Sequence, residues 1–151
     1  MRRTSALVAY VAAAAALLCP GSAFAAVNEA EGRAIEGLNE VRTAQGLAPL
    51  RASKALTQSA NAYSRRMLVG EFFGHQARIP VASRFRTAGE TLAWHTGWQP
   101  GAYRTLRQWM NSPPHRAVLL SPAFRLVGMG MERGRLGGRA ATIWVAHLGR
   151  R

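Results

Sequence analysis

The chain of 151 residues contains one cysteine, Cys19, within an apolar N-terminal stretch. A single cysteine cannot form an internal disulfide or a multi-cysteine zinc site. The chain also contains no aspartate, which excludes a Ser-His-Asp triad in its usual form and a calcium loop built on spaced aspartates. Because no covalent cross-link is available, the fold depends on a packed core, and an apolar content of 48% is enough to build one.

The first 25 residues have the pattern of a secretory signal peptide. Two arginines follow the initial methionine, residues 6–18 are an apolar run, and Ala23-Phe24-Ala25 ends the segment with small residues around a large one. The run is shorter than the roughly 20 apolar residues that a membrane span needs. We therefore expect cleavage after Ala25, export, and one domain over residues 26–151, with an uncleaved N-terminal anchor as the alternative. A lipoprotein would use Cys19, but the leucine before it is larger than the residue usual there.

The chain is strongly basic, with 20 lysines and arginines against 7 glutamates and a net charge of +13. The imbalance lies in residues 47–151, which hold 16 basic and three acidic residues. Such a surface attracts polyanions, whether nucleic acid, anionic lipid or an acidic cell-wall polymer. No tight basic run or interleaved aromatic pattern typical of nucleic-acid recognition is present, so specific nucleic-acid binding is not expected. The alternative is that the arginines form an ordinary solvated surface.

The apolar spacing predicts helices first and antiparallel strands later, which defines the α+β class. The helices are expected over residues 28–45, 54–69, 80–87, 100–111 and 115–120, and the strands over 91–94, 126–131 and 140–148. In the last strand, alternation places Ile143, Val145 and His147 on one face of the sheet. His147 is therefore expected to be a partly buried histidine with satisfied hydrogen bonds, and His95 a surface residue at a strand end.

An ordered set of motifs resembles the bacterial branch of the CAP superfamily, also called SCP-like extracellular proteins. The motifs are Leu38-Asn39-Glu40-Val41-Arg42, Phe73-Gly74-His75, Gly89-Glu90, Trp109-Met110-Asn111-Ser112-Pro113-Pro114-His115-Arg116, Val127-Gly128-Met129-Gly130 and Ile143-Trp144-Val145. They cover nearly all of residues 28–149. The resemblance implies a three-layer α-β-α sandwich with a small antiparallel sheet. It also implies a cleft lined by two histidines and up to two glutamates.

Carried over position by position, the resemblance assigns His75, His115 and Glu90 to this cleft. Ser112 stands where many members have a second glutamate. Two neutral imidazoles bind Zn²⁺ at about 2.0–2.1 Å, and Glu90 would be a third ligand, an orienting group or a base for metal-bound water. Without the second carboxylate we expect weak binding that fades as the histidines protonate near their usual pKa of about 6.5. The alternatives are a structural hydrogen-bond network of these three residues, or a nucleophilic pair of Ser112 and His115.

Three functions follow for a secreted CAP-like domain whose activity the sequence does not fix. The first is a binding module for a lipid, glycan or protein in the extracellular, periplasmic or cell-wall space. The four tryptophans, Trp94, Trp98, Trp109 and Trp144, are expected as core and rim anchors, and the alternative is that Trp94 and Trp98 stack on a sugar or a lipid. The second is a metal-assisted hydrolase that uses His75, Glu90 and His115 with a divalent ion such as zinc. The third is an arginine-rich adhesin for an anionic wall polymer or membrane surface. The sequence defines no oligomeric state.

Overall fold

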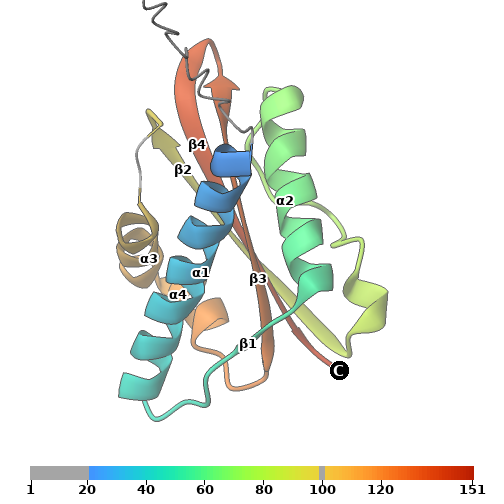
Figure 1. Cartoon of the computed structure of the whole chain (residues 1–151). Coiled ribbons are helices and arrows are strands. Elements are labelled where there is room, and N and C mark those ends of the chain that lie inside the picture. The colour runs from blue at the N-terminus through green and yellow to red at the C-terminus, as the bar shows by residue number, and fades with distance from the viewer. Residues whose placement is uncertain (1–20, 99–100) are drawn as a thin grey trace, which may run out of the picture.

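A four-stranded sheet lies between helices on its two faces in the computed structural model, which describes residues 21–98 and 101–151 (Figure 1). The elements in chain order are α1 (Gly21–Ala44), β1 (Arg51–Ala52), α2 (Lys54–Val69), the 3-10 turn η1 (Ala82–Arg84), β2 (Thr87–Thr96), α3 (Ala102–Met110), α4 (Pro113–Leu119), β3 (Leu126–Leu136) and β4 (Arg139–Arg150). None of the helices in these residues has the length and apolar character to cross a membrane. Most of the expected signal peptide lies outside the described residues, so its cleavage stays a prediction.

The strand order is β1-β3-β4-β2. The three long strands are antiparallel, as expected, and β1 adds a two-residue parallel partner to the start of β3. Gly137 and Gly138 close the β3–β4 hairpin with φ of 56° and 75°, a backbone conformation that glycine adopts without steric cost. β1 was not predicted because two residues are too short to show an alternating pattern.

One face of the sheet is covered by α2 and, near Gly149, by Phe85 from the segment that follows α2 (Figure 1). The apolar residues buried between α2 and the sheet are Ala60, Tyr63, Met67, Leu92, Ile143 and Val145. Two glycines on β3 set the distance between helix and sheet. A Cβ at Gly128 would lie 2.0 Å from the backbone nitrogen of Thr57, and one at Gly130 would lie 2.4 Å from the carbonyl carbon of Ala60. The backbone of α2 therefore rests directly on the backbone of β3.

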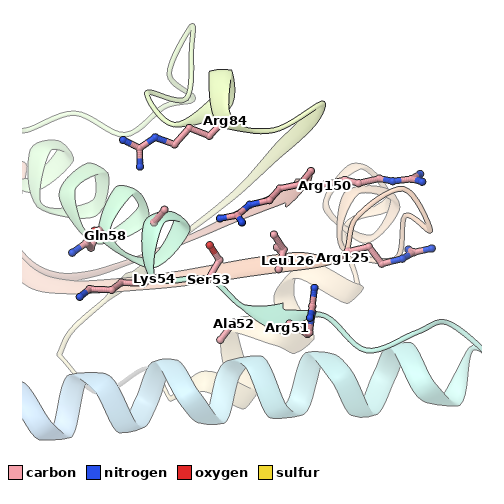
Figure 2. Close-up of a pocket in the computed structure, with 11 residues that line it drawn as sticks. Arg51, Ala52, Ser53, Lys54, Gln58, Arg84, Arg125, Leu126 and Arg150 are labelled. Carbon is pink, nitrogen blue, oxygen red and sulfur yellow. The ribbon is translucent and has the colours of Figure 1, made fainter.

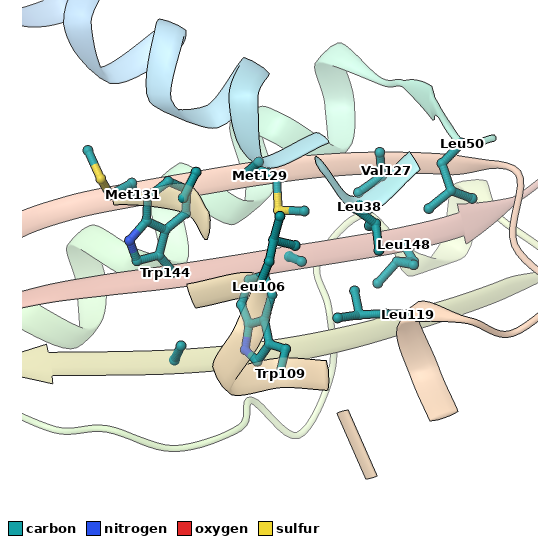
Figure 3. Close-up of a cluster of buried hydrophobic side chains, with 14 of the residues drawn as sticks. Leu38, Leu50, Leu106, Trp109, Leu119, Val127, Met129, Met131, Trp144 and Leu148 are labelled. Carbon is teal, nitrogen blue, oxygen red and sulfur yellow. The ribbon is translucent and has the colours of Figure 1, made fainter. Parts of the chain in front are cut away.

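The opposite face carries α1, α3 and α4 over the larger part of the core (Figure 3). The buried residues of this part of the core that Figure 3 labels include Leu38, Leu106, Trp109, Leu119, Met129, Trp144 and Leu148. The indole nitrogen of Trp109 donates a hydrogen bond to the carbonyl of Leu92 at 2.9 Å, which fixes α3 against β2. Ile143 and Val145 face α2 while Trp144 and Leu148 face this layer, so the alternation predicted for β4 is confirmed. The three-layer α-β-α sandwich is confirmed with it.

The first motif of the sequence has a structural explanation in the turn after α1. The Asn39 side chain donates to the Leu50 carbonyl at 2.9 Å and accepts from the Leu50 amide at 2.8 Å. Arg42 is fully buried and donates to the carbonyls of Ala48, Leu119 and Ser121. These bonds join the end of α1 to the end of α4.

Three details differ from the sequence-based expectations. The helix expected over residues 80–87 is only the three-residue turn η1, because β2 already begins at Thr87. α4 begins at Pro113, since a proline in the first helical turn lacks only an N–H that would have no intrahelical partner. His95 is 7% exposed rather than at the surface, because β2 extends to Thr96 and turns the imidazole toward α3. There its Nε2 lies 2.9 Å from the Thr105 hydroxyl.

Candidate functional site

Glu90 is the centre of a polar cluster on the α2 side of the sheet. It lies on β2 directly opposite His147 on β4. Its carboxylate is 6% exposed and accepts three hydrogen bonds. Oε1 accepts from His75 Nδ1 at 2.8 Å, and Oε2 accepts from Gln76 Nε2 at 2.7 Å and from His147 Nε2 at 3.0 Å. The sheet register and the loop after α2 thus bring together residues up to 72 positions apart.

These contacts determine which ring nitrogens carry hydrogen. An ionised carboxylate only accepts, so His75 Nδ1 and His147 Nε2 both donate to it. With Nε2 protonated, the 3.0 Å contact between His147 Nε2 and the Gln76 amide nitrogen joins two donors and is not a hydrogen bond. A neutral His75 then has its lone pair on Nε2, and its side chain is 60% exposed. The Nδ1 of His147 is buried and has no hydrogen-bond partner within the described residues. His75 is therefore the member of the cluster that presents a free ring nitrogen to a ligand.

The same contacts decide what Glu90 can do chemically. Burial would raise the pKa of Glu90, but the hydrogen bonds from His147, Gln76 and His75 outweigh it and hold this pKa below its usual value. Glu90 is accordingly ionised at neutral pH and is a weak proton acceptor. A general base works best with a pKa near the working pH, so Glu90 fits a binding or positioning role better than a catalytic one.

The loop that carries His75 is fixed by α2. The Tyr63 hydroxyl donates to the Gly74 carbonyl at 2.5 Å, and its ring packs edge-on to Phe72 with centroids 6.3 Å apart. The other side of the Tyr63 ring stacks on His147 at 6.5 Å. Burial, followed by the charge of Glu90, raises the pKa of Tyr63, so its hydroxyl remains a donor. The sequence predicted a helix over residues 54–69 but did not indicate this role of Tyr63.

His115 lies at the margin of the cluster. Its Nδ1 is 2.9 Å from the Ser112 hydroxyl at the start of α4. Burial lowers the pKa of His115, and electrostatic repulsion from His75 lowers this pKa further. Within the described residues no hydrogen bond joins His115 to Glu90, so the expected network is wrong in one member, whose place His147 takes. No carboxylate within the described residues orients His115 either, so the pair with Ser112 lacks the third group of a catalytic triad.

The donor set does not fit a three-ligand metal centre. In the part of the chain that the structure describes, no three histidine, cysteine or glutamate side chains are placed to hold one ion. Both oxygens of Glu90 are already taken by hydrogen-bond donors, which leaves only the ring nitrogens of His75 and His115. Zinc binding through these two histidines stays a prediction.

Two exposed aromatic rings lie beside this cluster. Phe73 is 43% exposed and Trp94 is 41% exposed, and their ring centroids are 6.4 Å apart at a 45° angle. Phe73 lies two residues before His75, and Trp94 lies on the same face of β2 as Glu90. Trp98 is 55% exposed, but its indole donates to the Gly134 carbonyl at the far hairpin. Of the two tryptophans proposed as stacking surfaces, only Trp94 adjoins the site.

A groove runs from the cluster along α2. A cavity of about 380 Å³ beside His75 adjoins one of about 350 Å³, and Tyr63, Arg66 and Gln76 line both. The segment that follows His75 forms the opposite wall through Arg78 and Val81. The site thus combines an exposed imidazole, an aromatic pair and an open groove.

Comparison with known proteins identifies the class to which this fold and site belong. The sequence model of the CAP family, the cysteine-rich secretory protein family, matches residues 35–148. The chain therefore belongs to the CAP family, although it has only one cysteine. It is 32% identical over 125 residues to the uncharacterized protein YkwD of Bacillus subtilis, a match that covers 76% of this chain. The chain spans about half, 48%, of that relative's length.

Two solved structures share the fold. One is an extracellular protein with an SCP domain from Bacillus anthracis, with a TM-score of 0.70 and 21% identity over 91% of this chain and 45% of that one. The other is an outer surface protein from Borrelia burgdorferi, with a TM-score of 0.65 and 21% identity over 82% of this chain and 93% of that one. At this identity they establish the architecture alone.

Proposed function

We propose that this CAP domain is an extracellular binding module that holds a glycan at the surface formed by His75, Phe73 and Trp94. The observation that carries the proposal is the exposed pair of Phe73 and Trp94 beside a polar cluster that is already fixed by its own hydrogen bonds. A flat aromatic ring covers the apolar C–H face of a sugar, and a neighbouring imidazole binds its hydroxyls. A pre-formed, open surface of this kind suits a ligand that is bound and released.

Two further observations support an extracellular location and a binding function. The N-terminal pattern is that of an exported protein, and the similar proteins include an extracellular protein and an outer surface protein. The lowered pKa of Glu90 and the occupation of both its oxygens argue against a hydrolase that would use Glu90 as its base. Binding therefore explains the geometry better than catalysis.

The test uses N-acetylglucosamine tetrasaccharide and insoluble peptidoglycan as probes. Calorimetry and tryptophan fluorescence should detect binding, and Trp94→Ala should weaken it at least tenfold. The matched control is Trp98→Ala, which removes a tryptophan that is more exposed than Trp94 and lies outside the site, and it should leave binding within twofold. Equal losses in both variants, or no binding by the wild-type protein, would overturn the proposal. Release of reducing sugar from peptidoglycan that depends on His75 and His115 would favour the hydrolase instead.

A further inference from the structure

A second, larger cavity lies at the other end of α2, away from the groove's His75 end. It has a volume of about 710 Å³ and opens between the start of α2, β1, η1 and the adjoining ends of β3 and β4 (Figure 2). Five arginines and one lysine line it: Arg51, Lys54, Arg84, Arg125, Arg150 and Arg151. We call this cavity the basic pocket.

No acidic side chain of the described residues balances the charge of the basic pocket. No glutamate lines it, and within residues 21–98 and 101–151 none of its six cations lies within salt-bridge distance of a carboxylate. The cations come from separate segments of the chain, so the fold and not a local basic run gathers them. The Arg125 guanidinium already donates to the carbonyls of Pro122 and Phe124. The other like charges around the cavity repel one another, and a bound anion relieves that repulsion.

Backbone and hydroxyl donors face the same cavity. Ser53 is the N-cap of α2, and its hydroxyl makes no capping hydrogen bond although the residue is only 9% exposed. Figure 2 shows this hydroxyl pointing into the pocket, on the side of Arg150. The N–H groups in the first turn of α2 have no intrahelical acceptors, and the positive end of the helix dipole favours an anion. The Ser53 hydroxyl is nearly buried and has no hydrogen-bond partner within the described residues. It is therefore a neutral donor in addition to the charged arginines.

The chemistry of these groups selects the ligand. Guanidinium groups bind phosphate oxygens in pairs, and a helix start and a hydroxyl are also donors suited to phosphate. Among the residues that the structure describes, no aromatic side chain lines the pocket, so they offer no surface on which a nucleobase would stack. We propose that the basic pocket binds the phosphodiester backbone of an extracellular polyol-phosphate polymer, a chain of phosphates without bases.

The first test removes two positive charges from the pocket and compares the loss of polymer binding with the loss caused by removing two positive charges elsewhere. Arg84→Gln/Arg150→Gln is the pocket variant; both side chains are exposed and neither makes a side-chain hydrogen bond within the described residues, so folding should be unchanged. Arg104→Gln/Arg107→Gln on α3 is the control with the same net charge. With poly(glycerol phosphate) as the probe, we expect the pocket variant to bind at least tenfold more weakly and the control to stay within threefold at equal salt. Equal losses would mean a diffuse charge effect and would overturn the proposal, as would no binding by the wild-type protein.

The second test separates anion binding from helix capping. Aspartate is as good an N-cap as serine, so Ser53→Asp should leave the melting temperature unchanged or raise it. The same change places a carboxylate among the arginines and should weaken polymer binding at least tenfold. Unchanged polymer binding by Ser53→Asp would overturn the proposal. Single-stranded DNA serves as the alternative phosphodiester probe, and tighter binding of DNA than of the polymer, with the same sensitivity to Arg84 and Arg150, would assign the pocket to nucleic acid instead.

Discussion

The buried carboxyl of Glu31 gives a stability prediction whose size follows from the structure. Glu31 lies on α1, is 4% exposed, and accepts a hydrogen bond at 3.2 Å from the amide of Met131 on β3. Asn61 on α2 accepts from the same amide at 3.3 Å. α1 and α2 therefore meet around the edge of β3 at this carboxyl. Burial raises the pKa of Glu31 from 4.5 to about 6, against the lowering effect of its hydrogen bonds with Asn61 and Met131.

The raised pKa means that the folded state holds the proton more tightly than the unfolded state does. The stabilisation is complete below the unfolded pKa of 4.5 and is lost as the pH rises through about 6. A difference of about 1.5 pKa units corresponds to about 2 kcal/mol. At pH 7 the ionised Glu31 therefore makes the protein about 2 kcal/mol less stable than it would be with a neutral side chain.

Glu31→Gln removes this ionisation and keeps an acceptor for the Met131 amide. Unfolding in urea, followed by tryptophan fluorescence at pH 4, 5, 6 and 7, should show the variant about 2 kcal/mol more stable at pH 7. With an m-value of about 2 kcal/mol/M, the midpoint moves up by about 1 M. The advantage should shrink through pH 6 and 5 and vanish by pH 4. This window coincides with the titration of the native carboxyl.

The control is Glu36→Gln, which removes the same charge from an exposed position on the same helix. Its free energy of unfolding should stay within about 0.5 kcal/mol of the wild type, as for most surface changes. A gain for Glu31→Gln that is the same at pH 4 and pH 7 would refute the argument from ionisation. So would a variant that is less stable than the wild type at pH 7.

Two further predictions concern the sheet and the histidines. Gly128→Ala places a Cβ against the backbone of α2 and should lower the free energy of unfolding, measured by thermal unfolding, by about 3 kcal/mol or more. The control Gly134→Ala meets only the flexible Leu68 side chain and should lower it by less than about 1 kcal/mol. Equal losses would contradict the close approach of helix and sheet. Zinc titrated by calorimetry should bind weakly at pH 7.5 and less at pH 5.5, because ligand histidines must be neutral, and His75→Ala should abolish it. Equal heats from the wild type and His115→Ala would exclude a site that uses both histidines.

Much of the fold follows from patterns that reach only a few residues along the chain. The alternation from Ile143 to Leu148 correctly separated the two faces of β4, and apolar spacing predicted α1, α2 and α3. The apolar residues at 126, 127, 129 and 131 predicted a strand, but nothing local showed that the glycines between them leave space for α2. The need for glycine at these positions depends on which helix packs on which face of the sheet, and this is set by the tertiary structure.

The site was predicted only where the family resemblance supplied its residues. His75 and Glu90 come together as that resemblance implied, but His147 completes the network in place of His115. The sheet register pairs residue 90 with residue 147, and a pattern of local periodicity contains no information on register between distant strands. The same limit applies to the basic pocket. Composition predicted an affinity for polyanions, whereas only the fold shows where cations gather without carboxylates.

The basic pocket and the cavity beside His75 are linked along α2 by a middle cavity that shares residues with both, which bears on the kind of ligand that would use both sites. The basic pocket and the middle cavity share Ala55, Gln58 and Arg84, and the middle cavity shares Tyr63 and Gln76 with the cavity beside His75. A helix of 16 residues spans about 24 Å, so several repeating units of an extended polymer would lie between the two ends. A chain that carries both phosphates and sugars would match this order if both proposals hold, with phosphate at the start of α2 and a sugar beside His75. Occupation of one end raises the effective concentration at the other, so two individually weak contacts are sufficient for firm attachment.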